Sequence, residues 1–348
     1  MSLNQLIKAR EGDFIETVDK LIFDVKGLVH PPDRVIAYVR YIESPAGDRV
    51  KGSKRYLKIY SLSEREILLR SRYPQYIHYD NVFGEWLESV PNNLITKHYQ
   101  PAQRTLEMLR EDCLDEVKAD IIRFIQELHD SSGVPLRSIG ISGSVLVELH
   151  MPSSDIDIIV YGRKNCISVY NGLKLLLRER KCGFSPYNHS DFKRLYSFRS
   201  KDTLMPFSKF RIIESRKAFQ GKFRGRDFFV RFVLDWDEVN EKYGDRIYRS
   251  AGYARIKAIV EDDSNSIFTP CSYNISNVRV LDGGCDGRLL REIISFRGRF
   301  CDQARRGELI IAQGKIEKII NKDGSERYRM VLGAKPSDFM IIKGKGTL

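Results

Sequence analysis

Apolar and polar residues alternate along most of the first 95 residues and again from about residue 246 onward. An alternation of period two predicts half-buried β-strands. The predicted strands of the first stretch cover residues 14–18, 21–25, 35–42 and 55–60, and residues 62–72 have a helical pattern. Those of the last stretch cover residues 256–260, 277–281, 309–312, 314–320 and 327–331. Short strands at this spacing are typical of a small barrel or a sandwich.

The middle of the chain adds apolar residues at helical spacing. They predict one long amphipathic helix from Leu106 to about residue 130, ended by Ser131-Ser132-Gly133, and a second helix over residues 167–177. The strands predicted between and after these helices lie at residues 139–141, around residues 155–157, and at residues 227–233. Strands that alternate with helices in this way indicate a mixed α/β unit.

These patterns together predict an α+β protein of three parts. We expect an N-terminal α+β domain over residues 1–98, a central α/β domain over residues 99–245, and a C-terminal β-rich domain over residues 246–348. A chain of 348 residues is long enough for two or three domains with their own hydrophobic cores.

The composition narrows the class of protein. The six cysteines have no CxxC spacing and no neighbouring histidine cluster, which argues against zinc and favours reduced thiols. The apolar runs are far shorter than a membrane span requires, and the residues after Met1 lack the apolar core of a signal peptide. We therefore expect a cytoplasmic protein with no membrane partner.

A net charge of +12 favours a polyanionic partner, although such a charge also occurs in proteins that bind none. Basic residues are dense over residues 190–232. The N-terminal strands also interleave basic and aromatic residues, namely Arg34, Arg40, Lys51, Lys54, Arg55 and Lys58 with Tyr38, Tyr41, Tyr56 and Tyr60. Such a surface suits base stacking and phosphate contact, but a sheet with buried tyrosines and solvated lysines gives the same pattern.

One short motif carries most of the chemistry. Asp155 and Asp157 are two residues apart on a predicted strand, so both point to one face and repel each other unless a cation lies between them. Gly143 and Ser144 lie at a predicted helix start, where free N–H groups hold phosphate. The alternative is a pair of solvated acids on an edge strand with Gly143 in a simple turn. The apolar residues around the acids argue against it, because a buried unpaired carboxylate is costly.

The spacing from Gly143-Ser144 to Asp155-Ile156-Asp157 resembles the DNA polymerase β-type nucleotidyltransferase superfamily. The resemblance covers roughly residues 137–235 and implies a nucleotidyltransferase-type central domain. It implies that Gly143 and Ser144 hold the triphosphate of an NTP, and that Asp155 and Asp157 are catalytic and hold two Mg²⁺ or Mn²⁺ ions. Basic residues such as Lys217 and Arg231 would neutralise the phosphates. The N-terminal residues 12–14 and 28–32 are similar to uncharacterised archaeal proteins with this domain.

The chain departs from the family pattern at a third carboxylate on a later strand. The corresponding position in the strand at residues 227–233 falls at or near Phe229. Asp227 is the third catalytic candidate, but it precedes Phe229 by two residues on the same face, roughly 7 Å along the strand. Asp235 and Asp237 lie past the strand's end. Either Asp227 serves after a shift, or the metal that activates the nucleophile is weakly held.

The predicted function is therefore metal-dependent transfer of a nucleotide from an NTP to an acceptor hydroxyl, with RNA or another nucleic acid as the favoured acceptor. Two alternatives stay open at this point. A degenerate transferase scaffold can serve as a nucleic-acid-binding protein, or the acceptor can be a protein or a small molecule. The sequence does not indicate which NTP is used or how many subunits assemble.

Overall fold

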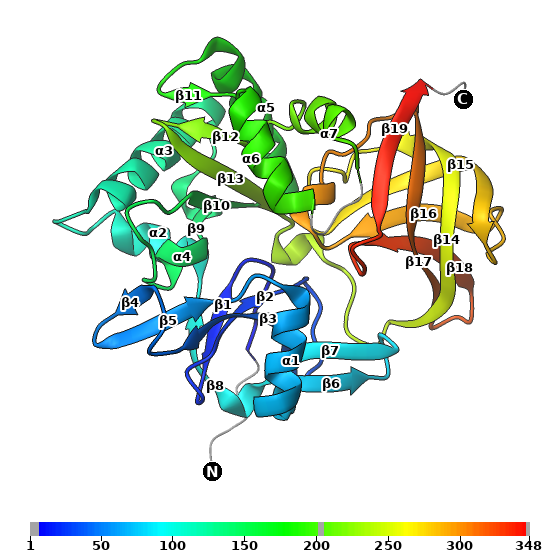
Figure 1. The fold of residues 1–348 in the computed structure, drawn as a ribbon, viewed down its shortest axis with the longest axis horizontal. Helices are drawn as coiled ribbons and strands as arrows, with labels where there is room; N and C mark the ends of the chain where they lie inside the picture. Colours follow the sequence, from blue (N-terminus) through cyan, green and yellow to red (C-terminus); the bar gives the residue numbers. More distant parts are fainter. Residues whose placement is uncertain (1–6, 201–204, 346–348) are drawn as a thin grey trace. The chain divides into compact units, whose positions relative to one another are not determined.

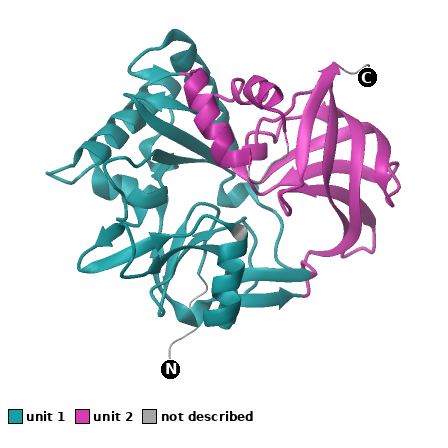
Figure 2. Ribbon diagram, viewed as in Figure 1, with its two compact units in different colours: residues 1–80, 85–185, 219–243 teal, residues 81–84, 186–218, 244–348 magenta. Residues whose placement is uncertain are grey.

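The computed structural model describes residues 7–200 and 205–345. Within them the chain forms two compact units (Figure 2). The first contains the residues up to 80, residues 85–185 and residues 219–243, and the second contains residues 81–84, 186–218 and the residues from 244 onward. The α+β class is confirmed. The boundaries expected at residues 98/99 and 245/246 stay predictions, and most of the first two expected domains falls in the first unit.

The N-terminal part of the first unit is a twisted antiparallel sheet, coloured blue to cyan in Figure 1. Its strands run in the order β4-β5-β3-β2-β1-β8, with β7 on β3 and β6 on β7. Their bounds are β1 Phe14–Thr17, β2 Ile22–Val25, β3 Arg34–Glu43, β4 Arg49–Lys51, β5 Lys54–Lys58, β6 Ile77–Asp80, β7 Glu85–Pro91 and β8 Ile95–Tyr99. Helix α1, Leu62–Arg72, agrees with the predicted helix and contributes Leu69 to the core on one face.

The two faces of this sheet have separate cores. Alternation along β2 sends Phe23 to the core that includes Leu69 of α1, and Ile22 to a second core on the opposite face. The second core combines aromatic residues of the N-terminal sheet with apolar residues that follow Gly143, and it consists of Phe14, Ile22, Tyr41, Tyr56, Tyr99, Leu146, Val147 and Leu149. This shared core holds the N-terminal sheet against the central part of the first unit.

The central sheet of the first unit has the strand order β11-β12-β13-β10-β9, and only β10 and β13 pair in parallel. The strands are β9 Ile139–Ile141, β10 Ile156–Tyr161, β11 Phe184–Ser185, β12 Gln220–Phe223 and β13 Arg226–Val233. Helices α3, Glu116–Ser132, and α5, Arg163–Glu179, cover one face (Figure 1). Phe124 of α3 contacts the rings of Phe223 and Phe228, which leaves the other face open to the N-terminal sheet.

The long helix predicted from Leu106 to about residue 130 is in fact two helices. Helix α2 covers Pro101–Met108, and α3 begins only at Glu116. The break has a local cause, because the carboxylate of Asp115 accepts a hydrogen bond from Lys118 N at 2.9 Å and so caps a new helix. Gly133 ends α3 in the left-handed conformation, with φ 69°, as its position after the serines predicted.

The second unit contains a closed barrel. Its strands follow the order β14-β15-β16-β18-β17, and β17 pairs back to β14, while β19 adds to β17. The bounds are β14 Arg246–Asp262, β15 Cys271–Gly283, β16 Leu290–Ser295, β17 Glu308–Asn321, β18 Glu326–Leu332 and β19 Phe339–Lys345. Helices α6, His189–Arg199, and α7, Phe207–Glu214, belong to the same unit. Of the two architectures left open by the sequence, the structure has the barrel, in an OB-like strand order.

Two expectations from composition can be compared with the structure. All six cysteines are free thiols, and Cys166, Cys271 and Cys301 among them are buried. Across the described ranges, none of the helices is long and apolar enough to cross a membrane.

His30 is a half-buried histidine in the loop between β2 and β3, and its two ring nitrogens have opposite roles. The backbone N–H of Ile36 donates to Nδ1 at 3.2 Å, so Nε2 carries the proton and donates to the carbonyl of Ala9 at 3.1 Å. A proton on Nδ1 would break the first of these bonds. Burial accordingly lowers the pKa of His30 to about 4.

We expect acid to weaken this sheet. An unfolded histidine has a pKa of about 6.5, so the unfolded chain binds a proton first as the pH falls. The contribution of His30 is complete above pH 6.5 and decreases toward pH 4, by about 2 kcal/mol at pH 5. Urea unfolding at pH 7 and pH 5 measures this loss. A His30→Asn variant should lose less stability between the two pH values, and an equal loss would contradict the assignment.

Candidate active site

The turn after β9 places its backbone directly against Asp157. Gly143 begins the short helix α4, Gly143–Leu146, with φ 62°, and a Cβ at this position would lie 2.8 Å from the Cβ of Asp157 and overlap its carboxylate. The preceding Ser142 donates its backbone N–H to the carbonyl of Asp157 at 2.9 Å. Both the left-handed backbone and the close approach require glycine. The turn at Gly143 and the strand that carries Asp157 are therefore in direct contact.

The parallel register of β10 and β13 fixes the neighbours of Asp157. Asp157 pairs with Phe229, and Ile159 pairs with Arg231. These side chains share the open face of the sheet, because Phe228 on the intervening position packs against α3. An aromatic ring therefore stands directly beside Asp157, where the family resemblance leads one to expect an acid.

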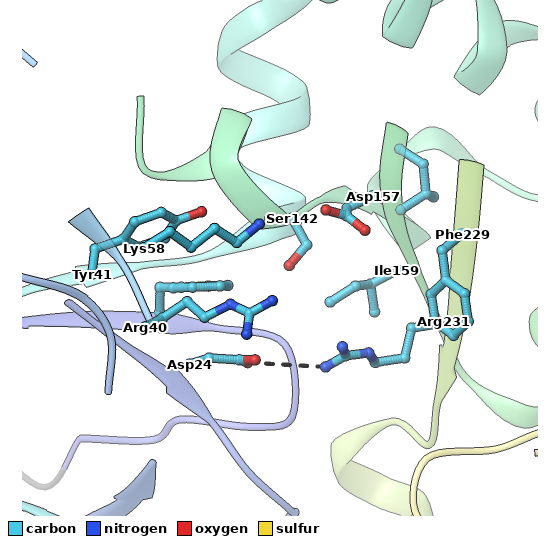
Figure 3. A pocket seen from close by; sticks show the side chains of 12 residues that line it. Asp24, Arg40, Tyr41, Lys58, Ser142, Asp157, Ile159, Phe229 and Arg231 are labelled. Carbon is cyan, nitrogen blue, oxygen red and sulfur yellow. Dashed lines mark ion pairs between the residues drawn. The ribbon is translucent and has the colours of Figure 1, made fainter. Parts of the chain in front are cut away.

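A pocket opens in front of Asp157 and is built by both sheets of the first unit (Figure 3). The N-terminal sheet contributes Phe14, Asp24, Arg40, Tyr41 and Lys58. The central sheet and its turn contribute Ser142, Gly143, Asp157, Ile158, Ile159, Phe229 and Arg231. In Figure 3, the side chains of Arg40 and Lys58 extend from one wall toward the wall that carries Asp157.

The pocket concentrates positive charge around a carboxylate. Among the described residues, no carboxylate oxygen lies within 4.0 Å of the cationic groups of Arg40 or Lys58, which instead lie 5.3 and 4.9 Å from the ring centre of Tyr60. Burial and the nearby Arg40 lower the pKa of Lys58. The third cation, Arg231, donates to Glu11 at 2.5 Å. Cations that converge without full carboxylate pairing favour an anionic ligand.

Asp157 is itself half-buried among these cations. Burial raises the pKa of its carboxyl, and the positive charges of Lys58, Arg231 and Arg40 oppose that increase. The negative charge of Asp24, on the opposite wall of the pocket, raises the pKa further. A bound cation or hydrogen-bond donor would further favour the ionised form of Asp157.

Residues before β1 close one end of the site. Gly12 packs so tightly on Ile159 that a Cβ there would overlap the isoleucine side chain, and its carbonyl accepts a hydrogen bond from the hydroxyl of Ser142 at 2.9 Å. The guanidinium of Arg10 lies 3.5 Å from the ring centre of Tyr161, two residues further along β10. These contacts cover the second half of β10 and leave Asp157 at the open end.

The other predicted site residues do not line this pocket. Asp155 is exposed and precedes β10. Ser144 is buried, and its hydroxyl donates to that of Ser154 at 3.3 Å. Asp227 lies on β13, next to β10, and forms an ion pair at 3.0 Å with Lys222 of β12. The catalytic roles of Asp155 and Asp227 and the triphosphate contact of Ser144 stay predictions, whereas Gly143, Asp157 and Arg231 are brought together.

Lys217 has a different position from the one its predicted role needs. It belongs to the second unit, and its ammonium donates to Glu214, to the carbonyl of Arg299 and to Gln303 at 2.7, 2.7 and 2.9 Å. The side chain is fully buried. Its three N–H groups are thus used within the barrel unit, so this placement corrects the predicted phosphate contact. The high density of basic residues over residues 190–232 gave no sign of this burial, because it does not distinguish a buried lysine from a solvated one.

The sequence interpretation missed Asp24 and did not connect Arg40, Tyr41 and Lys58 with Asp157. The only signal for the latter three was the interleaving of basic and aromatic residues in the N-terminal strands. The structure divides that pattern, because Tyr41 and Tyr56 belong to a core while Arg40 and Lys58 line the pocket. The buried tyrosines agree with the alternative in which aromatic residues form a core, and nucleic-acid contact by this surface stays a prediction.

The donor set was compared with the needs of the predicted Mg²⁺ or Mn²⁺ ions. The described residues contain no group of three or more His, Cys, Asp or Glu side chains that could hold a metal. Phe229 stands beside Asp157, and three cations share the pocket. Mg²⁺ is commonly bound through one or two carboxylates together with substrate phosphates. Asp157 lines the pocket and fits one such shared ion, whereas Asp155 does not line it, so the residues present do not fit the two-ion arrangement.

Comparison with known proteins finds a similar archaeal protein. The chain is 29% identical to Uncharacterized protein MJ1086 of Methanocaldococcus jannaschii over 341 residues, which cover 96% of this chain and 98% of the relative. No protein-family model matches the chain, and no solved structure does. The two chains are thus similar over nearly their whole lengths, including both units.

The close approach at Gly143 can be tested by substitution. Gly143→Ala should cost roughly 1–2 kcal/mol for the left-handed backbone and a further 1–3 kcal/mol for overlap with Asp157. Gly133→Ala is the matched control, because Gly133 has φ 69° but nothing lies within 4 Å of an added Cβ. Urea unfolding of both variants measures the difference. Equal losses would mean that the turn does not press against Asp157.

The charge of Asp157 can be tested by its pH dependence. Because the folded pKa of Asp157 is raised, the folded chain favours the protonated carboxyl more than the unfolded chain does, so stability is lost as the pH rises above about 4. Asp157→Asn should therefore have a higher Tm than the natural chain at pH 7, and the gain should shrink as the pH falls toward 4. Asp227→Asn should show no such gain, because it loses an ion pair with Lys222. Thermal melts across this pH range would disprove the assignment if Asp157→Asn melts lower at pH 7.

Proposed function

We propose that the protein is a nucleotidyltransferase that moves a nucleotide from an NTP to an acceptor hydroxyl, with RNA or another nucleic acid as the favoured acceptor. The observation that carries this proposal is the pocket in which Asp157, held against the Gly143 turn, faces Arg40, Lys58 and Arg231. A polyphosphate carries the negative charge that these cations need, and it also supplies the oxygen ligands for an ion on Asp157.

The cations of the pocket would hold the triphosphate. Arg40 and Lys58 come from adjacent strands β3 and β5, so the sheet fixes their spacing. Arg231 faces them from β13 and is oriented by its ion pair with Glu11. The exposed ring of Tyr60 lies beside Arg40 and Lys58, where it can stack on a nucleobase.

The reaction is an in-line displacement at the α-phosphorus. The acceptor oxygen forms a bond to the α-phosphorus, the bond from that phosphorus to the bridging oxygen of pyrophosphate breaks, and the hydroxyl proton is released. Asp157 would hold a Mg²⁺ ion, which would supply positive charge to neutralise the phosphates. Arg40, Lys58 and Arg231 bind and orient the chain of phosphates, and Phe14 and Phe229 limit the entry of water beside it.

A second candidate function is nucleotide or nucleic-acid binding without transfer. It is favoured by Phe229, which occupies the position beside Asp157 where a third carboxylate is expected. The net charge of +12 is equally compatible with both candidates. The proposed enzyme is preferred because simple phosphate binding gives no reason to keep the costly carboxylate of Asp157 among the cations.

The two candidate functions can be distinguished by incubating the protein with each α-labelled NTP, Mg²⁺ or Mn²⁺, and short RNA, and measuring label transfer to the RNA. We expect label in the RNA and a loss of transfer in Asp157→Asn. Lys58→Met should weaken NTP binding by roughly 10–100-fold, because a charge-assisted contact to phosphate is lost. Lys54→Met is the matched control, since Lys54 lies on the same strand but is exposed and paired with Glu43.

The outcomes of this assay are distinct. NTP binding without label transfer would favour the binding protein, and label in a protein acceptor would replace RNA as the substrate class. Calorimetry that detects no NTP binding, combined with no transfer, would rule out the enzyme and a nucleotide-binding protein, and a salt-dependent affinity for RNA would then test nucleic-acid binding by itself. If Lys58→Met and Lys54→Met weaken NTP binding equally, the NTP does not bind in this pocket.

A further inference from the structure

Asp24 is a carboxylate of the pocket that comes from the N-terminal sheet. It lies on β2, and its side chain is 15% exposed. One oxygen, Oδ2, accepts a hydrogen bond from Lys26 at 2.7 Å. The other oxygen, Oδ1, is buried without a hydrogen bond among the described residues and lies 4.0 Å from a guanidinium nitrogen of Arg231 (Figure 3).

The position of Asp24 relates it to the acid missing from β13. Asp157 and Asp24 line the same pocket from opposite walls and are close enough for the charge of Asp24 to act on Asp157. On the central sheet, the place beside Asp157 is filled by Phe229. Asp24 is therefore a second acid of this pocket, and its charge acts on Asp157 from the other sheet rather than from a neighbouring strand.

Asp24 is not needed to hold the two sheets together. Its ion-pair partners Lys26 and Arg231 both contact Glu11 as well, at 3.3 and 2.5 Å. The charge network therefore remains connected through Glu11 when the charge of Asp24 is removed. A buried acceptor without a hydrogen bond costs stability, and binding of a hydroxyl donor recovers that cost.

We propose that Asp24 completes the active site by binding the acceptor hydroxyl, in place of the carboxylate absent at Phe229. The inference rests on the proposed nucleotidyl transfer and adds a catalytic residue to it. Oδ1 accepts the hydrogen bond of the hydroxyl. As the acceptor oxygen bonds to the α-phosphorus and pyrophosphate leaves with the electrons of the broken P–O bond, the hydroxyl proton passes to the Asp24 carboxylate. The site is then assembled from two sheets.

Asp24→Asn tests the role with two separate measurements. Label transfer to RNA should fall by roughly 100-fold or more, as expected for loss of a general base, while NTP affinity measured by calorimetry stays within about threefold. A carboxylate restored on β13 should compensate. We expect the double variant Asp24→Asn/Phe229→Asp to transfer label at least about tenfold faster than Asp24→Asn alone, because position 229 lies directly beside Asp157.

Lys26→Gln controls for a merely structural role. It removes the ion pair with Asp24 but leaves the carboxylate, so it should lower the Tm and preserve most of the transfer rate. If Asp24→Asn transfers label as fast as the natural chain, or if Lys26→Gln loses as much transfer as Asp24→Asn, the assignment of Asp24 is overturned while nucleotidyl transfer stands. If the natural chain transfers no label, the proposed function fails and the role of Asp24 fails with it.

Discussion

The buried carboxylate of Glu11 joins the two halves of the candidate site. One of its oxygens accepts from Arg231 on β13 and from Lys26, and the other accepts from the backbone N–H of Gly27 at 2.7 Å. A charge at this depth is tolerated only because each oxygen has a partner. This cluster, together with the apolar core shared by the N-terminal sheet and the residues after α4, brings Arg40 and Lys58 opposite Asp157. The pocket exists only while these two sheets remain packed.

The electrostatics of the pocket explain why neither a simple metal site nor a simple anion site describes it. A metal site alone would place carboxylates together, yet Phe229 stands beside Asp157 and Lys58 faces it. An anion site alone has no use for Asp157, whose carboxylate is destabilised by burial and by Asp24. A polyphosphate that carries its own cation satisfies both sets of charges. This combination is the reason why we propose an NTP as the ligand.

The sequence predicts those features of the site that depend on residues close together in the chain, but not the contacts between the two sheets. The period-two pattern around Asp157, the turn at Gly143 and the position of Phe229 all follow from neighbours within a few residues, and the register of β10 and β13 agrees with them. The approach of Arg40 and Lys58 depends on packing between sheets about 100 residues apart in the chain, which no local pattern encodes. The same limit applies to Lys217, because two of its three partners, Arg299 and Gln303, come from the barrel unit 82 and 86 residues later.

A site divided between two sheets links substrate binding to the folding of the first unit. Arg40, Lys58 and Asp24 belong to the N-terminal sheet, while Asp157 and Arg231 belong to the central sheet. A ligand that contacts both walls binds only the packed arrangement, so its binding free energy adds to the stability of that arrangement. The repulsion between Asp24 and Asp157, and the incompletely paired charges of Arg40 and Lys58, act against packing when the pocket holds no ligand. Under the proposed function, a bound polyphosphate would therefore stabilise the packing of the two sheets.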